Sequence, residues 1–66
     1  MTDYASAVKA ERNRRRMNQD AFAGAAGLFR ATIVDIESGR IRLSREAFRD
    51  LVRRVDKYLA EGGATS

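Results

Sequence analysis

The sequence predicts a small all-α protein, and three observations support this prediction. Alanine, arginine, leucine and glutamate, which favour helices, are frequent among the 66 residues, and proline is absent. The β-branched residues are scattered, without the strict apolar–polar alternation that indicates a half-buried strand. Near the end of the chain, apolar residues recur at the spacing of one helix face, as Phe48, Leu51, Val52, Val55 and Leu59. We therefore expect a compact domain of four helices.

Capping residues set the expected bounds of the first two helices. The first is predicted over about 3–15, with Asp3 at the positive end of the helix dipole and arginines at the negative end. The second is predicted over 18–26, because Asn18 is a good N-cap residue. Gly27 follows at the position where helices commonly end in a left-handed conformation.

The last two helices follow the same rules. The third is predicted over about 30–38 and ends before Gly39. The fourth is predicted over about 44–61, with Ser44 as its N-cap. The glycine-rich segment 62–66 is expected to be a flexible tail.

The length of the chain allows one small domain, which we place at 1–61. A chain of this size buries only about 60% of its unfolded surface, so the core is marginal. Cysteine and histidine are absent, which excludes disulfides and thiolate or imidazole metal sites as further sources of stability. We expect no cofactor, and a second copy of the chain is the simplest remaining stabilising partner.

The charge balance favours a polyanionic partner. The net charge is +4, with 13 basic and 9 acidic residues, and all basic residues except Lys9 and Lys57 are arginine. Arginine binds phosphate and guanine with two hydrogen bonds, although GC-rich coding also enriches it. No apolar run of about 18 residues or secretory signal is visible, so we expect a cytoplasmic protein without a membrane partner. The sequence offers no catalytic group set and no reason to expect an enzyme or a small-molecule ligand.

The segment 18–39, NQDAFAGAAGLFRATIVDIESG, is the most informative part of the chain. Two helices of about eight residues are joined there by a turn of roughly three residues at Gly27. So short a turn requires a steep crossing, and Ala23 and Ala26 allow the helices to approach closely. This is the geometry of a helix-turn-helix, whose second helix lies in the DNA major groove.

Three features of the chain together resemble one known family. They are Arg12 in the first helix, the segment NQDAFAGAAG at 18–27 and the segment IVDIESG at 33–39. Their order and spacing resemble the lambdoid-phage repressor and Cro-like helix-turn-helix proteins, also called the XRE family. The likeness continues into the last helix and covers residues 4 to about 56. It implies a lambda-repressor-like fold and a regulator that binds double-stranded DNA through the helix around 30–38.

The resemblance also implies a role for each matching position. The groove-facing positions, which would contact bases, are Arg30, Ala31, Thr32 and Asp35. The positions that would contact the DNA backbone are Asn18, Gln19, Ser38, Arg40 and Arg42. Arg12 and Glu37 match a partly buried structural ion pair beneath the recognition helix.

Two groove-facing residues allow more than one interpretation. Arg30 can donate two hydrogen bonds to guanine, or it can contact a phosphate. Asp35 departs from the family, which often has an amide or a basic residue there. It can accept a hydrogen bond from cytosine or, as we favour, orient a neighbouring arginine, either Arg30 or Arg42.

Phe29 departs from the family too, because relatives commonly have a serine or threonine N-cap there. Phenylalanine cannot cap a helix, which forfeits about 1 kcal/mol. It can pack under the turn as a core residue, which we favour, contact DNA, or contact another protein. The run of arginines at 14–16 is interpreted as a solvated helix end, with a DNA-backbone contact as the alternative.

Family members usually bind as two-fold dimers on inverted repeats. The expected dimer interface consists of Ile41, Val55, Tyr58 and Leu59, with the alternative that Val55 and Leu59 complete the core. The expected function is repression by occupying an operator in a bacterial cell or phage-infected host. The rival hypotheses are a protein-interaction module, such as an antitoxin or adaptor, and a protein that binds structured RNA or the ribosome.

Overall fold

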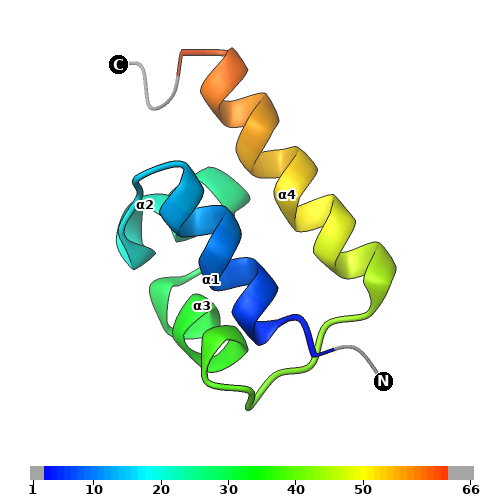
Figure 1. The fold of residues 1–66 in the computed structure, drawn as a ribbon. Helices are drawn as coiled ribbons and strands as arrows, with labels where there is room; N and C mark the ends of the chain where they lie inside the picture. The colour runs from blue at the N-terminus through cyan, green and yellow to red at the C-terminus, as the bar shows by residue number, and fades with distance from the viewer. Residues whose placement is uncertain (1–2, 63–66) are drawn as a thin grey trace.

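Four α-helices make up most of residues 3–62, which are the residues that this computed structural model describes (Figure 1). They are α1 (Ala5–Arg14), α2 (Gln19–Ala26), α3 (Arg30–Glu37) and α4 (Arg45–Ala60). The prediction of an all-α fold of four helices is confirmed. Of the expected tail, residues 63–66 lie outside the described residues. Within residues 3–62, no helix combines the length and the hydrophobicity that a membrane-spanning segment needs.

One apolar core joins the four helices. Its buried members are Val8, Phe22, Ala23, Ala25, Ala26, Ile33, Ile36, Leu51 and Val55. The short α2 is central, because it packs against both α3 and α4. Its three buried alanines have small side chains, which allows this close approach on two sides. Only the larger members, such as Phe22 and Ile33, each contribute the ~1.5–3 kcal/mol of a fully buried large apolar side chain.

Side-chain caps begin α2 and α4, as the sequence predicts. The Asn18 Oδ1 atom accepts a hydrogen bond of 2.8 Å from the Ala21 N–H group. The Ser44 Oγ atom accepts one of 3.0 Å from the Ala47 N–H group. Each cap satisfies an N–H group that has no partner within its helix.

A left-handed residue ends each of the first three helices. Gly27 and Gly39 adopt φ angles of 73° and 87° after α2 and α3, as their glycine signals predict. After α1 the same position is held by Arg16, with φ of 57°. The Arg16 and Met17 N–H groups donate to the carbonyls of Asn13 and Arg12, which satisfies two free carbonyls at the helix end. A side chain makes this conformation unfavourable, so the arginine is strained where a glycine would not be.

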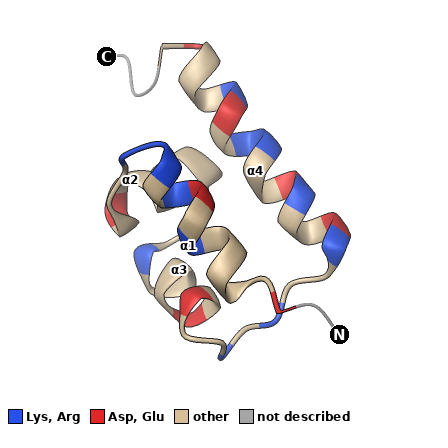
Figure 2. Cartoon of the chain, viewed as in Figure 1, with Lys and Arg blue, Asp and Glu red and all other residues tan. Residues whose placement is uncertain are grey.

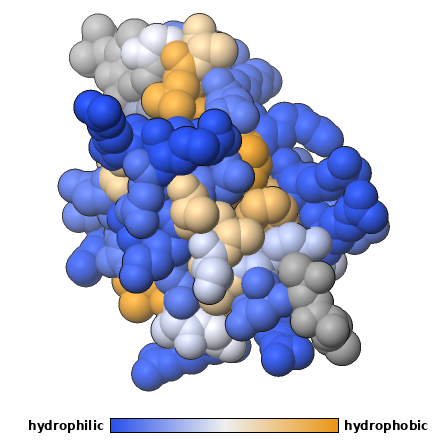
Figure 3. Space-filling model, in the orientation of Figure 1, coloured by the Kyte–Doolittle hydropathy of each residue, from blue (hydrophilic) through white to orange (hydrophobic). Residues whose placement is uncertain are grey.

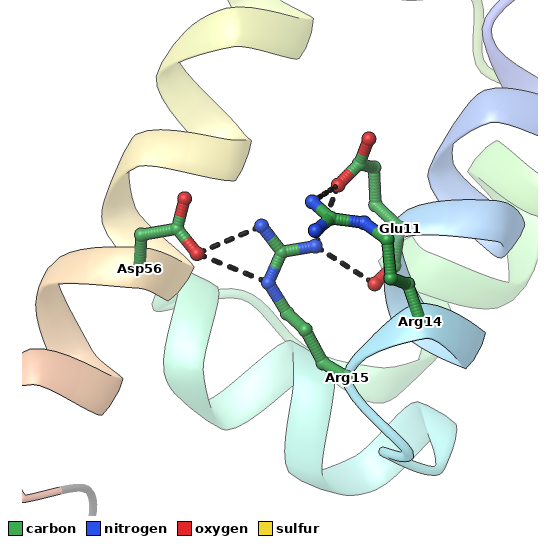
Figure 4. Close-up of polar contacts among 4 residues, drawn as sticks. All are labelled: Glu11, Arg14, Arg15 and Asp56. Atoms are coloured by element: carbon green, nitrogen blue, oxygen red, sulfur yellow. Dashed lines mark hydrogen bonds and ion pairs between the residues drawn. The ribbon is translucent and has the colours of Figure 1, made fainter.

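Helix α1 is attached to α4 near both of its ends. At the first end, the rings of Tyr4 and Phe48 stack with centroids 4.6 Å apart. At the other end, Arg15 donates to Asp56 across 2.7 Å and to Glu11 across 2.6 Å (Figure 4). The two helices therefore run in the same general direction (Figure 1).

The Arg15 guanidinium lies between two carboxylates, and its side chain is only 8% exposed. Burial lowers the pKa of Arg15, but the hydrogen bonds to Glu11 and Asp56 outweigh it and raise the pKa overall. The interpretation of the arginine run as a solvated helix end is therefore wrong for Arg15. The ion pair to Asp56 joins residues 41 positions apart, so no local pattern could reveal it.

Candidate nucleic-acid interface

The second and third helices form the expected helix-turn-helix arrangement. Three residues, 27–29, separate α2 from α3, and the two helices pack against each other. The side chains of Ile33 and Ile36 anchor α3 in the core. Since these two isoleucines occupy one side of α3, its opposite side faces away from the protein.

The outward side of α3 carries three of the four expected base-contacting residues. Arg30 and Ala31 are exposed, and the side chain of Asp35 is 38% exposed. Thr32 lies apart from them, because it lines a hollow between α3 and α4 together with Ile36. The structure thus leaves Arg30, Ala31 and Asp35 accessible to solvent and places Thr32 at the hollow beside α4.

Two surface ion pairs border this side of α3. The Arg30 Nε atom lies 3.6 Å from the Asp20 Oδ1 atom, in the first turn of α2. The Asp35 Oδ1 atom lies 3.7 Å from the Arg40 Nη1 atom, in the segment that follows α3. Asp35 therefore pairs with Arg40 and not with Arg30, which corrects that part of the expected orienting role.

The residues expected to contact the DNA backbone lie on both sides of α3 in the sequence. Asn18 and Gln19 begin α2, and Asn18 uses its side-chain oxygen as the N-cap. Ser38 donates from its hydroxyl to the Asp35 carbonyl at 3.0 Å, and the Arg40 side chain is 79% exposed. Arg42 is exposed as well.

The expected ion pair between Arg12 and Glu37 is present and has two hydrogen bonds. Arg12 Nε donates to Glu37 Oε2 at 2.8 Å, and Arg12 Nη2 donates to Glu37 Oε1 at 3.1 Å. The side chains are only 13% and 7% exposed. Hydrogen bonding to Glu37 raises the pKa of the Arg12 guanidinium above its usual range.

Two further hydrogen bonds extend this pair into a network. The Arg12 Nη1 atom donates to the Met17 carbonyl at 3.1 Å, and Gln19 Nε2 donates to Glu37 Oε1 at 3.4 Å. The network therefore links α1, the start of α2 and the end of α3. It holds α3 at a fixed place relative to the other helices.

Charge is distributed differently on α3 and α4. Figure 2 shows a basic residue at the start of α3 and others in the segment after it, whereas acidic and basic residues alternate along α4. The basic residues in question are Arg30, Arg40 and Arg42. Positive charge is therefore concentrated beside the exposed face of α3, and such charge attracts a polyanion.

Phe29 is 82% exposed, so its interpretation as a core residue is wrong. The Phe29 side chain would lie on the same helix face as Ile33 and Ile36 only if its backbone were helical. Phe29 is instead the N-cap of α3, with φ of −80° and ψ of 150°, and this extended backbone turns the ring outward. It forms no side-chain cap.

The residues expected to form a dimer interface do not lie in one patch. Val55 is 0% exposed, so it belongs to the core, and its assignment to an interface is wrong. Tyr58 is partly buried against the core. Ile41 and Leu59 are 39% and 43% exposed. They lie near opposite ends of α4, whose 16 residues extend over about 24 Å.

Ile41 has apolar neighbours that the sequence does not reveal. An apolar hollow of about 260 Å³ opens between α3 and α4, and its lining includes Leu28, Ile36, Ile41, Leu43 and Leu51. Leu28 and Ile41 are partly exposed at this hollow. The face of the molecule seen in Figure 3 is mostly hydrophilic, with hydrophobic residues in small separate areas.

A family model described as a helix-turn-helix domain matches residues 3–56 of the chain. The match covers α1, α2, α3 and most of α4. The chain belongs to the helix-turn-helix domain family. This agrees with the resemblance to the repressor and Cro-like proteins. No curated protein and no solved structure matched the chain.

Membership of the helix-turn-helix family indicates a DNA-binding regulator. Proteins of this family are typically not enzymes. In such a domain α2 and α3 are the helices that approach DNA, and α3 is the recognition helix. The exposed side of α3 described above is therefore the candidate nucleic-acid interface.

Proposed function

We propose that the chain is a transcriptional repressor that binds an inverted-repeat operator in double-stranded DNA as a homodimer. The observation that carries this proposal is the division of α3 into two sides. Ile33 and Ile36 hold one side in the core, while Arg30, Ala31 and Asp35 are available on the other. A helix anchored in this way can enter the major groove without rearrangement of the domain.

The residues around α3 suit the positioning role of backbone contacts. The start of α2, with Asn18 and Gln19, presents free N–H groups and the positive end of a helix dipole to a phosphate. Arg40 and Arg42, together with Ser38, would contact the backbone beyond the other end of α3. Such contacts fix the orientation of the protein, and the base contacts of Arg30 and its neighbours supply the specificity.

The apolar hollow supports a homodimer in which Ile41 and Leu28 contact the second copy. These are two exposed apolar side chains at one hollow, whereas Leu59 is at the far end of α4. A two-fold dimer contacts two half-sites. This explains how a reading surface of only three residues, Arg30, Ala31 and Asp35, becomes specific. The repressor would act in the cytoplasm by occupying a promoter, and its own concentration would control it.

Matched substitutions test the position of this interface. Ile41→Glu should shift the protein toward monomer in sedimentation experiments and weaken operator binding, because a charge would enter an apolar contact. Leu59→Glu serves as the control, since it places the same charge on a residue of similar exposure. A monomer from Leu59→Glu, with Ile41→Glu still dimeric, would move the interface to the end of α4.

Selection from random DNA tests the function itself. We expect an enriched palindrome whose half-sites are about one helical turn, ~34 Å, apart. Binding to it should weaken steeply as salt increases, because each neutralised phosphate releases counterions. Loss of Arg40 should weaken binding to all sequences and reduce the magnitude of the salt slope by about one. Recovery of no enriched sequence would refute a sequence-specific repressor.

The observation that favours a second function is the exposed ring of Phe29. An aromatic side chain that is 82% exposed is also suited to a protein contact, because aromatic residues are enriched at protein interfaces. A protein-interaction module, such as an antitoxin or adaptor, is therefore the alternative. It predicts a random-DNA selection without an enriched motif and a protein partner whose binding is lost in Phe29→Ala.

A further inference from the structure

We propose that Asp20 positions Arg30 for guanine recognition and thereby sets the base specificity of α3. This inference rests on the proposed function, and it adds a residue from a different helix to the reading surface. The relevant observation is the ion pair that crosses from the first turn of α2 to the first residue of α3.

The geometry leaves the two Nη atoms of the Arg30 guanidinium available for a base. Asp20 Oδ1 lies 3.6 Å from the Nε atom of Arg30. Within the described residues, Asp20 is the ion-pair partner of Arg30, and the contact is at Nε, so both Nη atoms remain available. Those two nitrogens form the fork that can donate together to the O6 and N7 atoms of guanine.

The pair stands at the surface, where it adds little to the stability of the folded chain. The Arg30 and Asp20 side chains are 63% and 75% exposed, and exposed pairs contribute little to folding. The situation changes when DNA covers the pair, because water is displaced and the attraction between the charges increases. The Arg30 guanidinium would then be held in one orientation while it contacts the base.

The negative charge of Asp20 also acts against a competing contact. A phosphate that approached Arg30 would lie close to the Asp20 carboxylate, and like charges repel. Guanine presents neutral acceptor atoms and meets less of this repulsion. Asp20 should therefore disfavour the use of Arg30 as a phosphate contact, at some cost in affinity for DNA of any sequence.

Asp35 is the other acid beside the reading surface, and it does not compete for this role. Its carboxylate pairs with Arg40, 3.7 Å away. The two acids thus serve different arginines, one at each end of α3. Asp20 is therefore the acid that can orient the principal base-reading residue, Arg30.

The test measures base preference in Asp20→Asn, which keeps the shape of the side chain and removes its charge. Operator affinity is compared with affinity for operators in which the guanine assigned to Arg30 is replaced. We expect the preference for guanine to fall by at least about two- to fivefold, the range of an exposed ion pair, because DNA covers the pair in the complex and strengthens it. Affinity for non-specific DNA should rise. Glu46→Gln is the matched control, because Glu46 is an exposed acid in the first turn of α4.

A double-mutant cycle distinguishes positioning from a general charge effect. In the Arg30→Ala background, Asp20→Asn should leave the base preference unchanged, since Asp20 has no arginine to orient. An equal loss of preference in both backgrounds would overturn the inference, as would an unchanged preference in Asp20→Asn itself. A wild-type protein that prefers no sequence would refute the proposed function and the inference together. A specific wild-type protein that is insensitive to Asp20→Asn would refute the inference alone.

Discussion

Replacement of Phe29 by serine should stabilise the protein while weakening its binding to the operator. Phe29 already has the extended backbone of an N-cap residue, with φ of −80° and ψ of 150°, but it forms no side-chain cap. Serine fits this conformation and can accept a hydrogen bond from an N–H group in the first turn of α3. The substitution therefore adds an interaction without changing the backbone.

The expected gain follows from the exposure of the ring. A serine N-cap contributes about 1 kcal/mol relative to a residue that cannot cap. Full burial of phenylalanine is worth about 1.5–3 kcal/mol, and the ring here is 82% exposed, so its removal costs only about 0.3–0.5 kcal/mol. The net gain is about 0.5 kcal/mol, which corresponds to a rise in Tm of about 2–4 °C for a domain of this size.

Thermal unfolding of the wild type, Phe29→Ser and Phe29→Ala separates the two contributions. Alanine removes the same ring but cannot cap, so the serine variant should exceed it by about 1 kcal/mol. Operator binding should fall in both variants, because the ring lies beside Arg30 on the exposed part of the helix-turn-helix. Equal stabilities of the two variants would refute the capping argument. A loss of more than about 1 kcal/mol in both would show that the ring is packed.

Three further substitutions test the structural contacts described above. Arg12→Ala should lower the free energy of unfolding, measured in urea, by about 3–5 kcal/mol, because it leaves the buried Glu37 carboxylate without its ion-pair partner. Replacement of both residues by apolar ones should restore most of this loss. Arg16→Gly should raise the free energy of unfolding by about 1 kcal/mol, since glycine adopts the left-handed conformation without strain, and an unchanged value would show that the arginine compensates through other contacts. Hydrogen bonds from Arg15 and Arg14 lower the pKa of Glu11. The stability that they contribute should be present above the ordinary glutamate pKa and should be lost as the pH falls through the lowered pKa of Glu11. The free energy of unfolding of Glu11→Gln should therefore depend less on acid pH than that of the wild type.

The helix bounds were predictable because their signals are local. Asn18 and Ser44 cap their helices through N–H groups three residues away, and Gly27 supplies a conformation that few other residues adopt. Each signal can be interpreted from a few neighbouring letters of the sequence. The end of α1 lacked such a signal, because Arg16 takes the left-handed position that glycine usually holds.

The candidate site was only partly predictable, because its geometry depends on residues far apart in the chain. Resemblance to a family supplied the pair of Arg12 and Glu37, whose 25-residue separation is not a local pattern. The family offered no such guide to the Asp20–Arg30 pair. Phe29 shows a different limit, since the sequence indicates that it cannot cap α3 but does not give the direction of its ring, which depends on the extended backbone there.

The anchoring of α3 has a consequence for how the protein can change over time. The isoleucines and the Glu37 network hold the helix from one side, and the residues proposed to read bases lie on the other. Exposed substitutions away from such anchors usually change stability by less than about 0.5 kcal/mol. New DNA preferences could therefore arise at positions 30, 31 and 35 without loss of the fold. The same separation makes this short chain a practical scaffold for redirecting a repressor to a chosen sequence.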